Sequence, residues 1–253
     1  MINFLKEKVK RYKNSANISE RFIYRFLTTL RMPYILLTNS RHRVELVAKW
    51  KNKSTHHQIS TYTKSNRYPV VFKECSQYLQ NIDSPRIISF GCSTGEEVRT
   101  LGQYIPNATI YGVDINQWCI KQCIKQNSSS SHYFYHRLSR EFECLQNIDA
   151  IFCMAVFQKT DDRLPNKKDN TKLFTFSAFE EDILFLDQKL NTNGLLIIDH
   201  SDFSFMDTAV AKNYVPLNFE GNQLLRKFPL YGTSNLKISD EKYIYRVFVK
   251  QRE

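Results

Sequence analysis

Short apolar runs alternate with helix-like stretches between residues 86 and 199. The runs predict strands at Arg86–Phe90, Thr109–Val113, His132–His136, Asp149–Val156 and Leu195–Asp199. The stretches between them predict helices over Glu96–Tyr104, Gln117–Gln126 and Phe179–Leu190, with the turn Asn193-Gly194 ending the last helix. Regular alternation of this kind is typical of a parallel α/β sheet with right-handed crossovers.

The C-terminal part of the chain has a different pattern. Two apolar-rich stretches, Leu217–Leu230 and Tyr243–Lys250, flank a turn-forming run at residues 231–235. We expect these two stretches to be strands of an antiparallel hairpin that closes the sheet.

The N-terminal 62 residues predict a basic helical extension followed by a linker or a mobile lid. Apolar residues recur at steps of three and four over residues 1–13, which is helical spacing. A second helix is expected to be capped by Ser19, to carry Phe22 and Phe26 on its apolar face, and to end near Pro33. The polar segment Lys49–Asn66 lacks periodicity. The sequence therefore predicts an extension at residues 1–62 and a catalytic domain at residues 63–253.

The positive charge of the chain is concentrated at its N-terminal end. The formal net charge is +11, and residues 1–84 contain 16 Lys and Arg against 5 Asp and Glu. Such an excess suits contact with an anionic partner, namely nucleic acid, a membrane surface or an acidic protein. A solvated basic face explains the charge equally well.

Two broad classes of protein are disfavoured by the composition. The longest aliphatic cluster, residues 32–37, is interrupted by Pro33 and is far shorter than the roughly 18 to 20 residues of a membrane-spanning helix. The six cysteines are scattered and contain no C-x-x-C pair, so neither a disulfide framework nor a zinc module is expected. Reduced thiols and a cytoplasmic location are the expectation.

The segment after the first predicted strand carries the clearest chemical signal. Gly91 and Gly95 form a Gly-x-x-x-Gly turn that leads into a helix, where the backbone can approach a ligand closely. The next strand ends at Asp114, 23 residues after Gly91, where a carboxylate of a βαβ unit faces the hydroxyls of a ligand ribose. The turn lacks G-x-G-x-x-G and no Gly-Lys-Ser/Thr follows, which disfavours an NAD site and a phosphate loop.

Four stretches resemble the CheR-type chemotaxis-receptor glutamate methyltransferases, a branch of the class I S-adenosylmethionine (SAM) methyltransferases. They lie between residues 63 and 202, at Asn66–Phe72, Cys92–Glu97, Phe152–Val156 and Asp199–Asp202. The resemblance implies a Rossmann-like seven-stranded sheet with SAM as the cofactor. Where the family has Arg-Asn on the fourth strand this chain has Met154-Ala155, and the family's N-terminal helical domain is not recognisable in residues 1–62.

The resemblance also implies a set of cofactor contacts. Glu96 would lie near the methionine amino group of SAM and Arg67 near its carboxylate, while Asp114 would bind the ribose and Ile115 would lie beside the adenine. The full set of implied cofactor-binding residues is Arg67, Gly91, Cys92, Ser93, Thr94, Gly95, Glu96, Asp114, Ile115 and Ala155.

The catalytic chemistry depends on the methyl acceptor. A carboxylate acceptor needs no general base, whereas a hydroxyl or amine benefits from one. His200 is the better candidate base and His136 the second, although His200 also suits a turn and His136 an adenine pocket. Asp199–Asp202 is not expected to bind a metal.

The sequence thus predicts methyl transfer from SAM to a carboxylate, hydroxyl or amine of a small molecule or protein. The alternatives are a nucleic-acid methyltransferase and a non-catalytic SAM-binding scaffold. Nucleic acid is not expected as the substrate, because the fourth strand is not followed by Asn-Pro-Pro-Tyr or Asp-Pro-Pro-Tyr. The basic extension is expected to cover the acceptor pocket or to bind an acidic partner.

Overall fold

The computed structural model describes residues 15, 17–26, 29, 43, 61, 63–159 and 168–251. The chain divides into two compact units, Met1–Lys51 and Asn52–Glu253. In the first unit residues 18–26 are helical, and Asn17 Oδ1 accepts a hydrogen bond from Ser19 N at 2.9 Å. Asn17 therefore caps this helix, and the cap predicted at Ser19 is wrong by two residues. The helix predicted over residues 1–13 lies outside the described residues.

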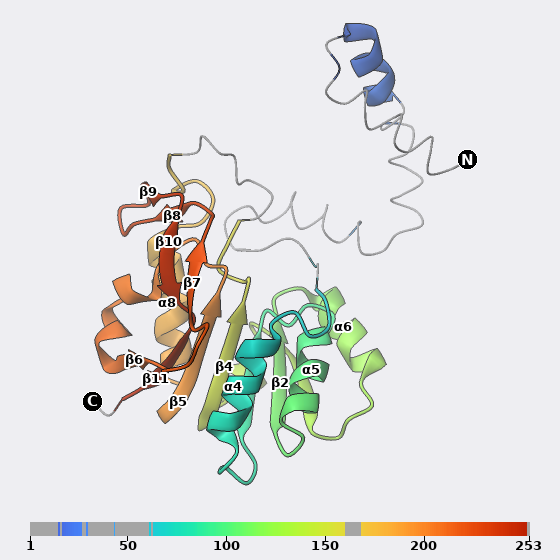
Figure 1. Ribbon diagram of the computed structural model, residues 1–253. Helices are drawn as coiled ribbons and strands as arrows, with labels where there is room; N and C mark the ends of the chain where they lie inside the picture. Colours follow the sequence, from blue (N-terminus) through green and yellow to red (C-terminus); the bar gives the residue numbers. More distant parts are fainter. Residues whose placement is uncertain are drawn as a thin grey trace. The chain divides into compact units, whose positions relative to one another are not determined.

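Across the described part of the second unit, seven strands form one mixed sheet in the order β3-β2-β1-β4-β5-β11-β6 (Figure 1). Strands β1 to β5 pair in parallel, whereas β11 runs antiparallel to both β5 and β6. The bounds are β1 Arg86–Phe90, β2 Thr109–Asp114, β3 His132–His136, β4 Ile148–Met154, β5 Leu190–Asp199, β6 Tyr214–Pro216 and β11 Val247–Lys250.

Helices cover both faces of the sheet (Figure 1). They are α4 Pro69–Leu79, α5 Glu96–Tyr104, α6 Gln117–Gln126, α7 Arg140–Glu143 and α8 Phe176–Asp187. Buried side chains of α4, α5 and α6 share one hydrophobic cluster with Ile87, and those of α7 and α8 share a second cluster with Ile88. Because neighbouring residues of a strand point to opposite faces, β1 contributes to both layers of core. None of the described helices is long and apolar enough to cross a membrane.

The helix predicted over Phe179–Leu190 is displaced by three residues. The Thr175 hydroxyl accepts from Ala178 N at 3.2 Å and caps α8, which ends at Asp187. The Asn193-Gly194 turn lies inside β5, where the register with β4 shifts and Asn193 has a φ of 63°. The turn signal therefore marks a bulge in a strand, and its assignment to a helix end is wrong.

The closing antiparallel hairpin is confirmed, and its strand β11 lies within the predicted strand Tyr243–Lys250, but the other predicted strand is wrong. β11 pairs with β6, which precedes the predicted stretch Leu217–Leu230. That stretch contains β7 Gln223–Arg226, which pairs instead with β10 Lys242–Tyr245, while β8 Leu230–Tyr231 pairs with β9 Lys237–Ser239. The side chain of Asn222 accepts from the N–H groups of Arg246 and Val247 at 3.0 and 2.8 Å, which divides β10 from β11.

Candidate functional site

The turn between β1 and α5 is folded tightly onto the end of β2. The N–H groups of Gly91 and Cys92 donate to the Val113 carbonyl at 2.7 and 3.0 Å. Gly91 and Gly95 have φ values of 76° and 87°, which favour glycine. A Cβ atom at Gly91 would lie 2.4 Å from Val156 Cγ2 at the end of β4. Both glycines are therefore required by the backbone of this turn.

Asp114 lies beside the turn, as the sequence predicts. Its Oδ2 accepts from Ser93 N at 2.9 Å, and its Oδ1 accepts from Asn116 N at 2.7 Å. Burial raises the Asp114 pKa, although the same two hydrogen bonds oppose the rise. A carboxylate has about four lone-pair positions, so two remain to accept hydrogen bonds from a ligand.

The other residues expected near a ribose and adenine also lie at this edge. His136, at the end of β3, places Nε2 2.8 Å from the carbonyl oxygen of Ile115. This contact fixes the loop after β2 and engages one ring nitrogen of His136. The Ser93 hydroxyl donates to the Thr61 carbonyl at 2.9 Å, so the end of the predicted lid segment contacts the turn.

The two glutamates that follow Gly95 have different surroundings. Glu96 accepts from the Thr94 hydroxyl at 2.7 Å and lies 3.3 Å from the guanidinium of Arg99. The family resemblance implies that Glu96 lies near the amino group of the cofactor.

Glu97, which the sequence analysis did not single out, reaches back over β1. Its Oε1 accepts from the Ser89 hydroxyl at 2.8 Å. Burial raises the Glu97 pKa to about 7, although the Ser89 hydrogen bond and the charge of Arg67 both oppose the rise. A carboxylate that is held partly protonated and near Arg67 is a candidate ligand-binding group. The only sequence signal for it was the second glutamate of the Cys92–Glu97 motif.

Tyr68, at the start of α4, is a second residue that the sequence analysis missed. Its side chain is buried, and its hydroxyl has no hydrogen-bond partner among the described residues. Burial raises the Tyr68 pKa, and the charge of Asp199 adds to the rise. The guanidinium carbon of Arg67 lies 5.2 Å from the centre of the Tyr68 ring. A buried polar group without a partner indicates a place where a ligand atom can bind.

Backbone strain is concentrated at the same edge of the sheet. In the described part of the chain, the non-glycine residues with positive φ are four asparagines, which tolerate it, and Ser93, Ala155 and His200 with φ of 50°, 62° and 53°. These three residues follow β1, β4 and β5. Strained residues cluster at functional sites, and ligands of open α/β sheets bind at the carboxyl ends of the strands. The carboxyl edge is therefore the candidate site.

His200 is held by a buried acid at the end of β5. Its Nδ1 lies 2.9 Å from Asp199 Oδ1, and the other carboxylate oxygen lies 3.3 Å from Arg246 Nη1. Burial by itself would raise the Asp199 pKa, but His200 and Arg246 outweigh it and hold this pKa below its usual value. Nε2 is the ring nitrogen that this contact leaves unengaged.

Asp202 is engaged in a different interaction. It accepts from the backbone N–H of Lys159 at 3.0 Å and lies 3.6 Å from the guanidinium of Arg226. No group of three His, Cys, Asp or Glu side chains in the described residues is arranged to hold a metal ion.

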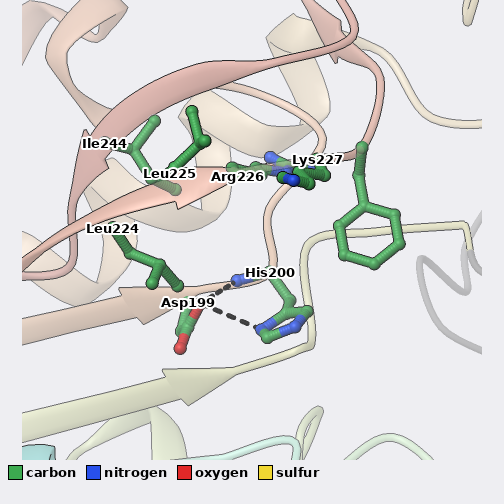
Figure 2. A pocket seen from close by; sticks show the side chains of 8 residues that line it. Asp199, His200, Leu224, Leu225, Arg226, Lys227 and Ile244 are labelled. Carbon is green, nitrogen blue, oxygen red and sulfur yellow. Dashed lines mark hydrogen bonds and ion pairs between the residues drawn. The ribbon is translucent and has the colours of Figure 1, made fainter.

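A cavity of about 250 Å³ adjoins His200 (Figure 2). It lies between the end of β5 and the β7–β10 hairpin, and its lining residues are Asp199, His200, Leu224, Leu225, Arg226, Lys227, Phe228 and Ile244. Apart from Asp199 and His200, none of these residues was singled out from the sequence, because the hairpin that supplies them was not predicted.

The strand order, with an antiparallel β11 between β5 and β6, decides the fold. This order confirms the predicted Rossmann-like seven-stranded sheet closed by an antiparallel hairpin. No protein-family model and no curated protein matches the sequence. Solved structures with a similar fold include PKMT2 from Rickettsia typhi, with 15% identity, a TM-score of 0.38, and coverage of 50% of this chain and 24% of that one. The chain thus spans about a quarter of the PKMT2 chain.

Two further solved structures cover more of the chain. The plantazolicin methyltransferase BpumL in complex with S-adenosylhomocysteine (SAH) is 16% identical over 77% of this chain and 61% of that one, with a TM-score of 0.37. The precorrin-6y C5,15-methyltransferase from Geobacter metallireducens GS-15 is 12% identical over 76% of this chain and 94% of that one, with a TM-score of 0.45.

Proposed function

We propose that the protein is a SAM-dependent methyltransferase. The observation that supports this most directly is the contact between Asp114 and Ser93, which joins the carboxylate at the end of β2 to the glycine turn at the end of β1. The two lone-pair positions left on Asp114 suit the two hydroxyls of a ribose. SAM supplies an electrophilic methyl group on a sulfonium centre.

The remaining cofactor contacts follow from the same edge. Arg67 would pair with the carboxylate of the methionine part of SAM, and Ile115 would lie against the adenine. We assign the ammonium group to Glu97, because Glu96 is already engaged by Thr94 and Arg99. The cofactor-binding set is then Arg67, Gly91, Cys92, Ser93, Thr94, Gly95, Glu97, Asp114, Ile115 and Ala155.

His200 is the proposed general base for a hydroxyl or amine acceptor. Asp199 lies 2.9 Å from Nδ1, which leaves Nε2 as the ring nitrogen that would take the acceptor proton. The new bond from the acceptor to the methyl carbon forms as the sulfur–methyl bond breaks, and the bonding pair remains on sulfur. The replacement of the family's Arg-Asn by Met154-Ala155 argues against a receptor glutamate as the acceptor.

Calorimetric titration with SAH tests the cofactor assignment. Replacing Asp114 with alanine removes two charge-assisted hydrogen bonds, each contributing about 1.5 to 3 kcal/mol, so SAH affinity should fall at least about tenfold. Asp149→Ala is the matched control, because Asp149 also accepts two hydrogen bonds, from Arg86 N at 2.8 Å and Asn191 Nδ2 at 2.9 Å. Absence of SAH binding by the wild type, or equal losses in both variants, would contradict the proposal.

A further inference from the structure

The cavity beside His200 shares no lining residue with the glycine turn. The chemistry of its lining residues indicates which kind of methyl acceptor it can bind. We propose that this cavity binds the methyl acceptor, and that the acceptor is a small single-ring aromatic molecule carrying a hydroxyl group and a carboxylate. The inference rests on the proposed methyltransferase function and deepens it.

Most of the cavity wall is apolar. Leu224 and Leu225 of β7, Phe228 of the following loop and Ile244 of β10 line it. Leu224 and Phe228 remain 41% and 42% exposed, although their side chains are large and apolar. Apolar and aromatic walls with a few polar groups are typical of small-molecule sites, and an aromatic ring would pack well against Phe228.

The size of the cavity limits the acceptor. Its volume of about 250 Å³ lies below the roughly 300 to 1,000 Å³ of sites for drug-sized ligands. A single substituted ring is therefore the appropriate size. A folded protein surface or a nucleic-acid duplex could enter only through one protruding group.

The charges around the cavity favour an anionic acceptor. Two charged lining residues face a partner of opposite sign, since Asp199 lies 3.3 Å from Arg246 and Arg226 lies 3.6 Å from Asp202. Lys227 is exposed and forms no ion pair with any described residue. The cavity thus has one uncompensated positive charge, which a ligand carboxylate would neutralise.

His200 connects the cavity to the proposed cofactor edge. Its ring centre lies 6.0 Å from that of Phe228 on the cavity side and 6.0 Å from that of Tyr68 on the other. Tyr68 carries the buried hydroxyl without a described partner, next to Arg67. An acceptor hydroxyl near His200 would therefore lie between the cavity and the methyl donor. His200 would take the hydroxyl proton, and the products would be a methyl ether and the neutral thioether of the cofactor.

Binding to the SAH-saturated protein tests the inference without requiring turnover. The probes are the three hydroxybenzoate isomers and the matching hydroxybenzamides, which keep the ring and hydroxyl but lack the charge. We expect at least one hydroxybenzoate to bind about fivefold more tightly than its amide, as an accessible ion pair allows. Lys227→Met keeps the aliphatic stem and should remove this preference. Lys242→Met, an exposed lysine of the same hairpin outside the cavity lining, should retain it.

The outcomes separate this inference from the proposed function. If the protein binds SAH but no hydroxybenzoate, or binds acid and amide equally, the inference is wrong and the methyltransferase assignment stands. Transfer of labelled methyl from SAM to bulk RNA, with none to the hydroxybenzoates, would also overturn it. Failure to bind SAH at all would overturn the proposed function itself.

Discussion

Replacing Glu97 with glutamine should uncouple cofactor binding from proton release. Burial raises the Glu97 pKa to about 7 in the free protein. The ammonium group of SAH, placed against this carboxylate, would stabilise its ionised form and return its pKa toward the usual range. Cofactor binding below pH 7 would then displace the Glu97 proton.

The size of the effect follows from the pKa of about 7. About nine-tenths of the Glu97 side chains hold a proton at pH 6, and about one-tenth at pH 8. SAH should therefore release about 0.9 proton at pH 6 and about 0.1 at pH 8, and its affinity should rise about tenfold between them. The glutamine variant has no proton to release at this position, so its affinity should change little over the same range.

Calorimetry at pH 6 in two buffers of different ionisation enthalpy measures the released protons directly. Glu96→Gln is the matched control, because it removes the neighbouring carboxylate and leaves Glu97 in place. Proton release should persist in Glu96→Gln and vanish in Glu97→Gln. Equal release by the wild type and Glu97→Gln, or none by the wild type, would refute the assignment of Glu97 to the ammonium group.

The same pKa affects stability in a defined direction. The folded-state pKa of Glu97, about 7, exceeds the ordinary value of 4.5, so folding favours the protonated form. The contribution of protonated Glu97 to the free energy of unfolding is fully present below about pH 4.5 and is lost as the pH rises through 7. Urea unfolding should therefore show the wild type losing more stability between pH 5 and pH 8 than Glu97→Gln, by an amount that partial exposure of the side chain reduces.

Two further predictions concern the turn and the thiols. Gly91→Ala should destabilise the protein by about 1 to 3 kcal/mol from backbone strain, and further because its Cβ would lie 2.4 Å from Val156. Gly221→Ala is the control, because Gly221 also has a positive φ, 90°, but the nearest atom to its Cβ would be 3.8 Å away, so only the strain should destabilise it. Equal losses of unfolding free energy in urea would show that the Val156 clash contributes nothing. All six cysteines are free and only Cys144 is exposed, so a thiol reagent should label one site in the folded protein, and labelling that survives Cys144→Ser would contradict this.

Local sequence signals were sufficient to predict the bounds of an element where adjacent residues determine where it begins and ends. The bounds of β1, β3, α5 and α6 agree with the prediction at both ends. α6 begins after Asn116, whose side chain accepts from Trp118 N at 3.0 Å, and α5 begins after Gly95 in the left-handed region. Such caps depend only on adjacent residues, so the sequence contains the information.

The helix α4 was missed although its signal is present. Pro69 occupies its first turn, and Val71, Phe72, Cys75 and Leu79 are buried at helical spacing. Residues 66–72 carry a motif, and the helical period becomes apparent only when it is followed beyond them to Leu79. Tyr68, whose buried hydroxyl has no partner among the described residues, lies at the start of this helix.

The cavity beside His200 depends on contacts between residues that are distant in the sequence. Asp199, the last residue of β5, pairs with Arg246, which directly follows β10. Asp202, three residues later, pairs with Arg226, the last residue of β7. All four side chains are buried, and burying ion pairs is costly unless each charge is matched. Matching these charges fixes one position of the hairpin over His200, and thereby forms the cavity. An unpaired arginine in that core would be unfavourable, so the pairing selects against other placements of the hairpin. The sequence shows four charged residues without their pairing, and this is why the β7–β10 pairing and the cavity were not predicted. The glycine turn beside Asp114 depends on a local motif and was predicted.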